Sequence, residues 1–394
     1  MRKIIALIGL STALISTLTP AGTLHIGNAD TATGKLDISG AVRTRYLYKD
    51  YADSANEGSA NGDWKLADIK LVVAYENPDW IASMDTRCYQ YERLCDAIFL
   101  KDAWLGYKFS DQHRVNVGLQ SVDFGYARLW GNSYYETILN TVGIEDIQNT
   151  GIKYQYNDDK NHITLGFYPR DGGNYKGPTK DSSRYSGNFV QADDLSTGTD
   201  IEEKNMWIGR ISRNISINSE QNFKTEIGAS YWYSELENQI GPQDGHRKTW
   251  NAFAVTDYQN WQWMLSVGEQ DIQTNDLNHP FDSTIGAFDY PYQVANKARF
   301  AATEISYSIK EPFKNISEIK PYLTYSTYNK QQSGFIDSDR LNAGFYFFYK
   351  NLGIQAEYIR SKNDPMTGGS SLSLGQGDHN KASQLFFVSA GYYF

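Results

Sequence analysis

The residues that most often do covalent chemistry form no recognisable catalytic pattern. None of the six histidines stands in a Ser/His/Asp arrangement typical of nucleophilic catalysis. The acid pairs at 193–194 and 202–203 are expected on a solvated loop, and His279 and His379 stand apart from other metal ligands. No phosphate loop or dinucleotide fingerprint occurs in the sequence. We therefore expect no catalytic residues, no metal ion and no cofactor.

The two cysteines favour a disulfide. Cys88 and Cys95 flank the short polar segment Tyr-Gln-Tyr-Glu-Arg-Leu. In an oxidising compartment, a nearby pair of this kind closes a loop. A metal site is the weaker interpretation, because no second Cys/His pair lies nearby. We predict a Cys88–Cys95 disulfide.

Charged residues form a further pattern, in which acids and bases fall on different segments. Acids gather in the segment 123–149, and bases recur at alternate positions of segments expected to be strands. The acids are Asp123, Glu136, Glu145 and Asp146, with Tyr126 and Arg128 in the same segment. The bases are Arg43, Arg45, Lys70, Arg87, Arg114 and Lys153, of which Arg87 lies in the least regular segment.

Two interpretations of these charges remain open. If the segment 123–149 lies opposite the bases across a narrow opening, the two sets create a transverse field that selects solutes by charge. If they lie at a rim, they form ordinary solvated salt bridges. The elements that position these residues must be predicted from the rest of the chain.

The N-terminus has the pattern of a secretory signal. Met1-Arg2-Lys3 is a positive head, and 4–18 is apolar with a few small polar residues. Small residues at Thr19-Pro20-Ala21 and at Gly27-Asn28-Ala29 offer two cleavage sites. A retained membrane anchor is the alternative, but the run is short of the roughly 20 residues that a spanning helix needs. We predict a signal peptide within residues 1–29, cut at about residue 21 or 29.

Composition favours a chain whose side chains alternate between lipid and water. Mean hydropathy is -0.55, yet 14% of residues are aromatic, including 29 Tyr, and only 10 are Pro. Transmembrane β-barrels have this composition, although a secreted soluble β-sandwich shares it. With 37 basic and 46 acidic residues, the chain has no excess of positive charge for binding nucleic acid. We therefore expect no nucleic-acid partner.

Alternating segments of the strand type recur along the whole chain after the signal. They are residues 35–48, 65–75, 80–89, 98–109, 113–122, 150–156, 162–168, 205–215, 223–235, 249–258, 261–271, 297–308, 319–328, 340–349, 352–362 and 383–394. The connections between them alternate between short and long. Bacterial outer-membrane barrels have short periplasmic turns and long extracellular loops, whereas a soluble sandwich has no reason to keep such an alternation.

We therefore predict an all-β fold, a closed antiparallel transmembrane β-barrel of about 16 strands, formed by residues 30–394 in the bacterial outer membrane. A barrel of this size encloses a water-filled lumen. The last segment carries Phe386, Val388, Ala390, Tyr392 and Phe394 on one face. That face resembles the signal that such barrels present to their assembly machinery. The expected partners are this machinery, membrane lipid, lipopolysaccharide and small solutes.

One region resembles a known family. It includes Lys101–Tyr107, Val117–Gln120 and Asp123–Gly125, and continues through Gly143–Asp146 to Thr150–Tyr154. This run is similar to Gram-negative outer-membrane porins, nearest to the phosphate-selective porins O and P. The resemblance covers about residues 68–168 and the last strand. It implies passive diffusion of small polar or charged solutes, a third loop that folds into the pore, and a possible homotrimer.

The resemblance does not assign the solute. Phosphate selectivity in that family is associated with bases lining the pore, whereas this chain is acidic overall and has no dense Lys/Arg run. Two other functions remain open: surface binding or adhesion through loops 169–204 and 272–296, and, as the weakest alternative, a barrel enzyme. A plugged active transporter would need about 22 strands and a plug domain, for which the chain is too short.

Overall fold

The computed structural model describes residues 22–51, 62–90, 93–95, 97–170, 184–190, 201–218, 223–239, 241–288, 290–378 and 381–394. Residues 1–21, which hold most of the predicted signal peptide, lie outside the described residues, as do the acid pair 193–194 and His379. Among the described residues, no helix is long and apolar enough to cross a membrane.

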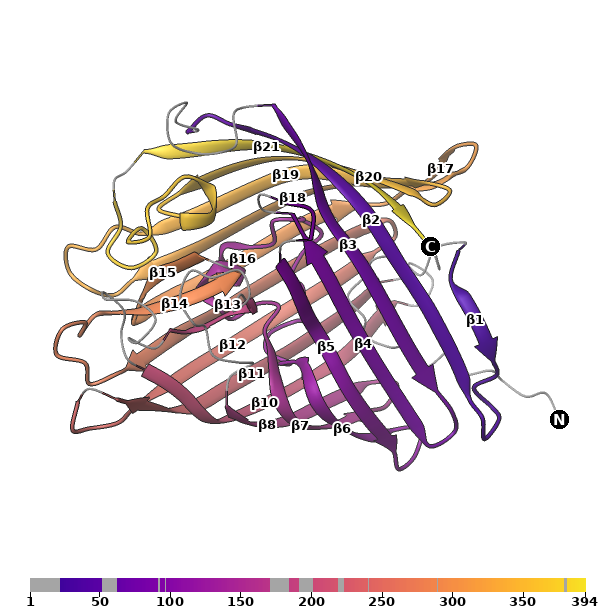
Figure 1. The fold of residues 1–394 in the computed structure, drawn as a ribbon, viewed down its shortest axis with the longest axis horizontal. Helices are drawn as coiled ribbons and strands as arrows, with labels where there is room; N and C mark the ends of the chain where they lie inside the picture. The colour runs from indigo at the N-terminus through magenta and orange to yellow at the C-terminus, as the bar shows by residue number, and fades with distance from the viewer. Residues whose placement is uncertain are drawn as a thin grey trace.

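The described residues form a closed antiparallel β-barrel of sixteen long strands (Figure 1). The strands are β2 (Lys35–Lys49), β3 (Asp63–Glu76), β4 (Trp80–Tyr89), β5 (Ala97–Lys108), β6 (His113–Ser121), β7 (Gln148–Asn157), β8 (Asn161–Arg170), β10 (Ile201–Asn218), β11 (Phe223–Asn238), β12 (Gly245–Tyr258), β13 (Trp261–Gln273), β16 (Lys297–Tyr307), β18 (Ile316–Lys330), β19 (Ser338–Tyr349), β20 (Leu352–Lys362) and β21 (Ala382–Tyr393). Each corresponds to one of the predicted segments, so the predicted fold class is confirmed.

The two ends of the barrel differ as the loop pattern predicted. Short turns join β3 to β4, β5 to β6 and β19 to β20 at the end that also holds β1 (Leu24–Gly27) and Phe394. At the same end, the turn between β16 and β18 is extended by the short strand β17 (Ile309–Phe313). The long connections lie at the opposite end. By this arrangement, the end with the short turns is the periplasmic one.

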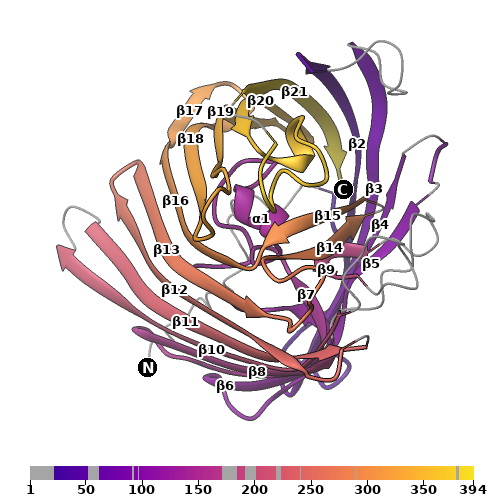
Figure 2. The same cartoon turned by 90° about the vertical axis from the view of Figure 1, so that its left-hand side faces the viewer.

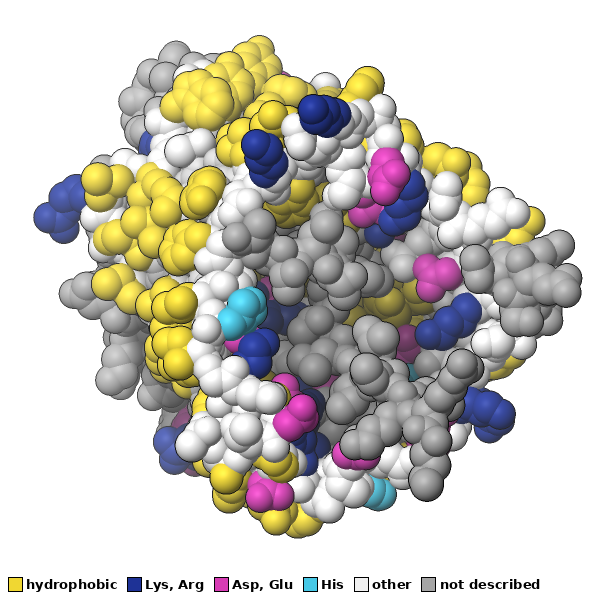
Figure 3. Space-filling view, turned by 90° about the vertical axis from the view of Figure 1, so that its right-hand side faces the viewer, with side chains coloured by type: hydrophobic (Ala, Val, Ile, Leu, Met, Phe, Trp, Pro, Cys, Tyr) yellow, Lys and Arg dark blue, Asp and Glu magenta, His cyan; other side chains and the backbone are white. Residues whose placement is uncertain are grey.

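Each strand separates an outer face from an inner face. In β13, Trp263, Leu265 and Val267 are exposed, whereas the alternate residues Met264 and Ser266 are buried. This two-residue period sets apolar side chains toward lipid and the others toward the interior. Seen from the periplasmic end, hydrophobic side chains gather on the outer rim, while several charged side chains lie further inward (Figure 3).

Long connections fold into the barrel. The third loop, residues 122–147, lies inside the ring of strands with its helix α1 (Ile138–Val142) (Figure 2). Beside it is a small inner sheet of β9 (Arg184–Phe189), β14 (Asp282–Phe288) and β15 (Tyr290–Ala295). The last long connection adds the 3-10 helix η3 (Pro365–Thr367). The sequence analysis treated these strands as parts of connections.

The third loop and the inner sheet share one hydrophobic core with the strands. Trp130 and Ile138 of the loop, Phe189 and Tyr292 of the inner sheet, and Trp232 of β11 are all buried in it. Burying such side chains is strongly favourable, since each removes a large apolar area from water. The loop is therefore a packed part of the fold, and only part of the interior remains for water.

A β-bulge in β5 changes the direction of side chains in the early strands. Opposite Asp85 and Thr86 of β4, β5 places Asp102 and Leu100, so Lys101 is an extra residue. Lys101 and Asp102 are consequently both buried on the inner side. A bulge of this kind re-aims side chains without ending the strand pairing.

The barrel closes where β2 meets two strands. Residues 41–49 of β2 pair with β21, and residues 35–38 pair with β1. Between the two, Gly40 and Phe394 exchange backbone hydrogen bonds of 2.7 and 3.0 Å. Thus β1 occupies the edge of β2 that β21 leaves free, and Leu24 and Ile26 extend the exposed apolar surface.

We propose that the signal peptide is cut near Ala21, because a cut after Ala29 would remove β1. The mature protein should begin within one or two residues of Gly22, as N-terminal sequencing will show. Deleting residues 22–29 should lower the temperature at which the barrel loses its compact mobility in SDS gels, since the edge of β2 loses a hydrogen-bonded partner. A mature N-terminus at Asp30 would contradict the proposal.

Candidate functional site

Five inward-facing bases lie close together where β2–β5 meet the third loop. We call them the basic ladder: Arg43, Lys70, Arg87, Lys101 and Arg128. Arg43 binds Asp68 through two hydrogen bonds of 2.9 and 2.5 Å. Each of the others also has an acidic partner. Burying a charge costs much less when it is paired, which explains why every base of the ladder has an acidic partner.

Asp85 and Asp102 are the next acidic partners. Both Lys70 and Arg87 bind Asp85, with N–O distances of 3.5 and 3.1 Å. Arg128 reaches from the third loop to Asp102 of β5 at 3.2 Å. These ion pairs involve one loop residue and the three strands β3, β4 and β5.

Asp146 is buried at the point where the third loop returns to the barrel wall, and several donors converge on its carboxylate. It accepts from Lys101 at 2.6 Å, from Arg128 at 2.7 Å and from the hydroxyl of Tyr185 at 3.0 Å. Gln148 donates a further bond at 2.8 Å. With its oxygens satisfied, Asp146 fixes the loop and does not present a free charge.

Within the ladder, every base except the buried Lys101 is more accessible than its acidic partner. Arg43 is 16% exposed and Asp68 is 0% exposed, while Arg128 is 28% exposed and Asp146 is 1% exposed. Lys70 and Arg87 are likewise more exposed than Asp85. Although the bases are paired, water on this side of the interior therefore meets mostly cationic groups.

Glu145 has a structural position inside the third loop. Its carboxylate accepts from the backbone N–H of Trp130 at 2.6 Å and from the hydroxyl of Thr137 at 2.6 Å. Thr137 is also the N-cap of α1, where its side chain accepts from Leu139. Burial raises the pKa of Glu145 to about 7, although the Thr137 and Trp130 hydrogen bonds favour the charged form.

Glu136 differs from the other acids of the loop. One of its carboxylate oxygens, Oε2, is buried without a hydrogen-bond partner, and its backbone has a positive φ of 59°. Its backbone carbonyl is held by Asn342, which donates at 2.7 Å. Burial, together with the charges of Asp146 and Glu145, raises the pKa of Glu136 well above its ordinary value.

In two ion pairs near β7–β11, the acid is more exposed than the base. Asp123 binds Lys153 at 2.8 Å and is 21% exposed, whereas Lys153 is 5% exposed. Glu226 is also more exposed than its partner Arg210. Although burial opposes ionisation, Lys153 and other donors hold the pKa of Asp123 below its ordinary value. This region presents negative charge to the interior.

The remaining predicted residues have different surroundings. Arg45 has no ion pair among the described residues, and its Nε atom lacks a hydrogen-bond partner. Arg114 donates to Gln155 at 3.2 Å. The ring of Tyr126 lies edge-on to Phe253 at 6.0 Å, and its backbone carbonyl accepts from Arg210.

Comparisons with known proteins give a consistent result. The sequence profile described as "Phosphate-selective porin O and P" matches residues 57–231. No curated protein sequence matches the chain significantly. Among solved structures, Salmonella typhi OmpF in complex with daunomycin has a TM-score of 0.58 and 14% identity, covering 94% of this chain and 100% of that one.

Two further structures have the same fold. The outer membrane channel DcaP of Acinetobacter baumannii has a TM-score of 0.57 and 11% identity, covering 94% of this chain and 100% of that one. The anion-selective porin from Comamonas acidovorans has a TM-score of 0.55 and 11% identity, covering 92% and 100%. The family profile thus matches residues 57–231, and the barrel as a whole has the fold of outer-membrane porins. This confirms the resemblance to porins of the O and P group, the outer-membrane location and a role in passive diffusion.

The porin also contains the predicted disulfide. Cys88 and Cys95 are bonded, with their Cα atoms 4.9 Å apart. The bond joins the extracellular ends of β4 and β5. Those strands carry Arg87 and Lys101, so the disulfide supports the wall on which the basic ladder stands.

The sequence analysis missed the residues that hold the third loop against the far wall. Arg340 of β19 donates to the carbonyl of Tyr135 at 2.7 Å, to the hydroxyl of Thr141 at 2.8 Å and to Asp364 at 2.7 Å. Glu304 of β16 accepts from the backbone N–H of Asn132 at 2.7 Å. The available signal was strand parity, which places both side chains on the inner face.

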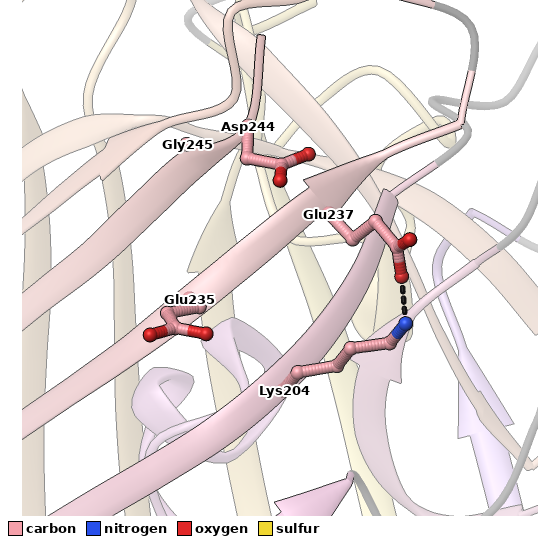
Figure 4. A pocket seen from close by; sticks show the side chains of 5 residues that line it. All are labelled: Lys204, Glu235, Glu237, Asp244 and Gly245. Atoms are coloured by element: carbon pink, nitrogen blue, oxygen red, sulfur yellow. Dashed lines mark ion pairs between the residues drawn. The ribbon is translucent and has the colours of Figure 1, made fainter.

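A small pocket lies near the extracellular end of β10–β12 (Figure 4). It has a volume of about 250 Å³ and is lined by Lys204, Glu235, Glu237, Asp244 and Gly245. Lys204 and Glu237 point toward each other and form an ion pair. Among the described residues, no group of three acidic, His or Cys side chains is arranged to hold a metal ion.

Replacing Arg340 should loosen the third loop without unfolding the porin. In Arg340→Gln, the loop loses charge-assisted bonds at Tyr135 and Thr141. Single-channel recordings in planar bilayers should then show larger current fluctuations than the wild type. Arg360→Gln, which changes an arginine on the outer face of β20, is the matched control and should behave as the wild type. Equal noise in all three proteins would show that Arg340 does not hold the loop.

Proposed function

We propose that this porin preferentially passes small anionic solutes. The proposal rests on one observation: every base of the ladder except the buried Lys101 is clearly more exposed than the acid that neutralises it. A solute in water near β2–β5 therefore meets guanidinium and ammonium groups first. Exposed rings of bases favour anions in pores, because they concentrate counter-ions in a confined volume of low dielectric surroundings.

The overall negative charge of the chain does not oppose this preference. Selectivity depends on charges beside the solute, and charges further than about 10 Å away through salt water are largely screened. The acidic partners of the basic ladder include Asp68, Asp102 and Asp146, and these three side chains are buried. They hold the bases in place and contribute less to the field that a solute meets.

We assign separate roles to the predicted residues. Arg43, Arg45, Lys70 and Arg87 form the basic wall, with Arg128 facing it from the third loop. Asp123 and Glu136 form the acidic side of the pore constriction, while Glu145 and Asp146 maintain the shape of the third loop. In this proposal, the segment 123–149 narrows the passage, and Arg114 and Lys153 lie on the wall below it.

The comparisons support an anionic solute class without specifying one compound. The matching family is described as phosphate-selective, and one structural neighbour is described as anion-selective. Inorganic phosphate remains one candidate among small anions. We also propose a homotrimer, since OmpT of Vibrio cholerae, with 11% identity and a TM-score of 0.54, is described in a trimer form. An enzymatic role forms no part of this proposal.

Ion selectivity tests the proposal directly. Across a salt gradient in a planar bilayer, the reversal potential of the mature porin should show a preference for anions. The Arg43→Gln/Arg45→Gln variant should shift it toward cations, because two bases are removed from the wall. Because Asp68 loses its partner in that variant, Arg45→Gln alone provides a second test that breaks no ion pair.

The control for this experiment is Arg213→Gln, which changes an exposed arginine on the outer face of β10. Its reversal potential should equal that of the wild type. A cation-preferring wild type would reject the anionic solute class. An unchanged reversal potential in both Arg45 variants would reject the role of the basic wall.

The preference should also depend on pH through Glu136. Its pKa is raised, so the carboxyl is neutral below that pKa and negatively charged above it. Anion preference should therefore be greatest at acidic pH and should decrease as the pH rises and Glu136 ionises. In Glu136→Gln, this decrease should be smaller, as measured from reversal potentials between about pH 5 and 9. An identical pH profile in the two proteins would show that Glu136 does not contribute to the ion selectivity of the pore.

A further inference from the structure

We propose that Tyr185 is a positioning residue for ion selectivity, because it keeps Arg87 available to solutes and prevents Asp146 from neutralising it. Tyr185 belongs to β9 of the inner sheet, which lies inside the ring of strands (Figure 2). This strand comes from the long extracellular connection between β8 and β10. The inference rests on the proposed anion preference, and it makes that preference depend on a residue outside the barrel wall.

Two bases of the ladder lie against the ring of Tyr185. The ammonium nitrogen of Lys101 is 3.8 Å from the ring centroid, and the guanidinium carbon of Arg87 is 5.1 Å from it. Both lie within the distance of about 6 Å at which the face of an aromatic ring attracts a cation. One uncharged side chain therefore stabilises two positive charges without neutralising either of them.

The hydroxyl of Tyr185 lies between Arg87 and Asp146. Arg87 donates from Nη1 to this oxygen at 3.2 Å, and the hydroxyl donates to Oδ2 of Asp146 at 3.0 Å. Among the described residues, Asp85 is the carboxylate that binds Arg87 directly, at 3.1 Å. A guanidinium and a carboxylate that share one hydroxyl are close enough to form an ion pair when that side chain is removed.

The charges of the basic ladder explain why an uncharged partner is needed. The five bases share four carboxylates, those of Asp68, Asp85, Asp102 and Asp146. Lys70 and Arg87 are directly opposed on β3 and β4, and both bind Asp85. Like charges in this position repel each other. The repulsion pushes Arg87 away from β3, and the contacts with Tyr185 oppose this movement.

The inner sheet, the third loop and the barrel wall together fix the place of Tyr185. The backbone N–H of Gln148 donates to the hydroxyl of the next residue, Ser186, at 3.2 Å, and this hydroxyl donates to the Gln148 carbonyl at 3.4 Å. Phe99 of β5 packs edge-on against the Tyr185 ring at 6.4 Å. On its other side, β9 is paired with β14. An extracellular connection thus contributes directly to the surroundings of the ladder.

Reversal potentials of the mature full-length porin in a potassium chloride gradient test the proposal. In Tyr185→Leu, Arg87 loses the ring and can pair with Asp146, so a second carboxylate reduces its positive potential. The permeability ratio of chloride to potassium should fall about two- to fivefold, the population change that loss of one cation–π contact allows. Tyr185→Phe keeps the ring and should retain most of the wild-type ratio.

A double variant separates positioning from a general structural effect. Because Tyr185 acts through Arg87, Arg87→Gln/Tyr185→Leu should have the same permeability ratio as Arg87→Gln alone. The matched control is Tyr292→Phe, which removes a hydroxyl of the same inner sheet that donates to the carbonyl of Thr141 at 2.8 Å. Its permeability ratio should equal that of the wild type. Tyr185→Met is a second ring-free variant, which keeps the test possible if the leucine variant does not fold.

Three outcomes would overturn the role of Tyr185. They are a wild-type ratio in the ring-free variants, an equal fall in Tyr185→Phe and Tyr185→Leu, and a further fall when Tyr185→Leu is added to Arg87→Gln. A wild type that prefers cations would reject the proposed function instead. In that case, a lower chloride permeability in Tyr185→Leu than in Tyr185→Phe would still support the positioning of Arg87, and equal values would overturn it.

Discussion

The absence of water in the membrane interior is the constraint on which this structure depends. Each backbone N–H and C=O within the lipid must be bonded inside the protein, so the sheet has to close on itself. Closure takes place at β2, whose edge is shared by β21 and β1 around the Gly40–Phe394 bonds. Once the ring is closed, side-chain direction follows from strand parity except at β-bulges, and most polar side chains within the lipid span face the interior.

The interior then faces a second requirement, because charged groups placed there lose part of their hydration. The porin meets it by pairing almost every inward base of β2–β5 with a carboxylate. Except in the Lys101–Asp146 pair, the acid is more deeply buried than the base. A wall that is nearly neutral in composition can thus be cationic at its surface. This separation of buried and accessible charge connects the packing of the barrel with its selectivity.

The sequence predicted well what depends on local pattern. The sixteen strands follow from a two-residue period, and the third loop from its length and its aromatic residues. Contacts between distant segments could not be predicted in this way. Lys101 reaches Asp146 only because a β-bulge turns two successive residues inward. Arg340 and Glu304 hold the third loop from strands about 170 to 200 residues further on, a relation that parity alone does not specify. Sequence analysis therefore did not separate the acids that shape the loop from those that face water.

The third loop also connects different walls of the barrel from the inside. A ring of sixteen strands can flatten without breaking its ladder hydrogen bonds, because bending a sheet costs little. Here residues 122–147 are bonded to Ser230 of β11, Glu304 of β16 and Arg340 of β19, and they return to Lys101 of β5. The loop acts as an internal tie between walls that face each other. These bonds oppose a change in the distance between the walls, so the loop resists flattening of the barrel under lateral pressure from the surrounding membrane.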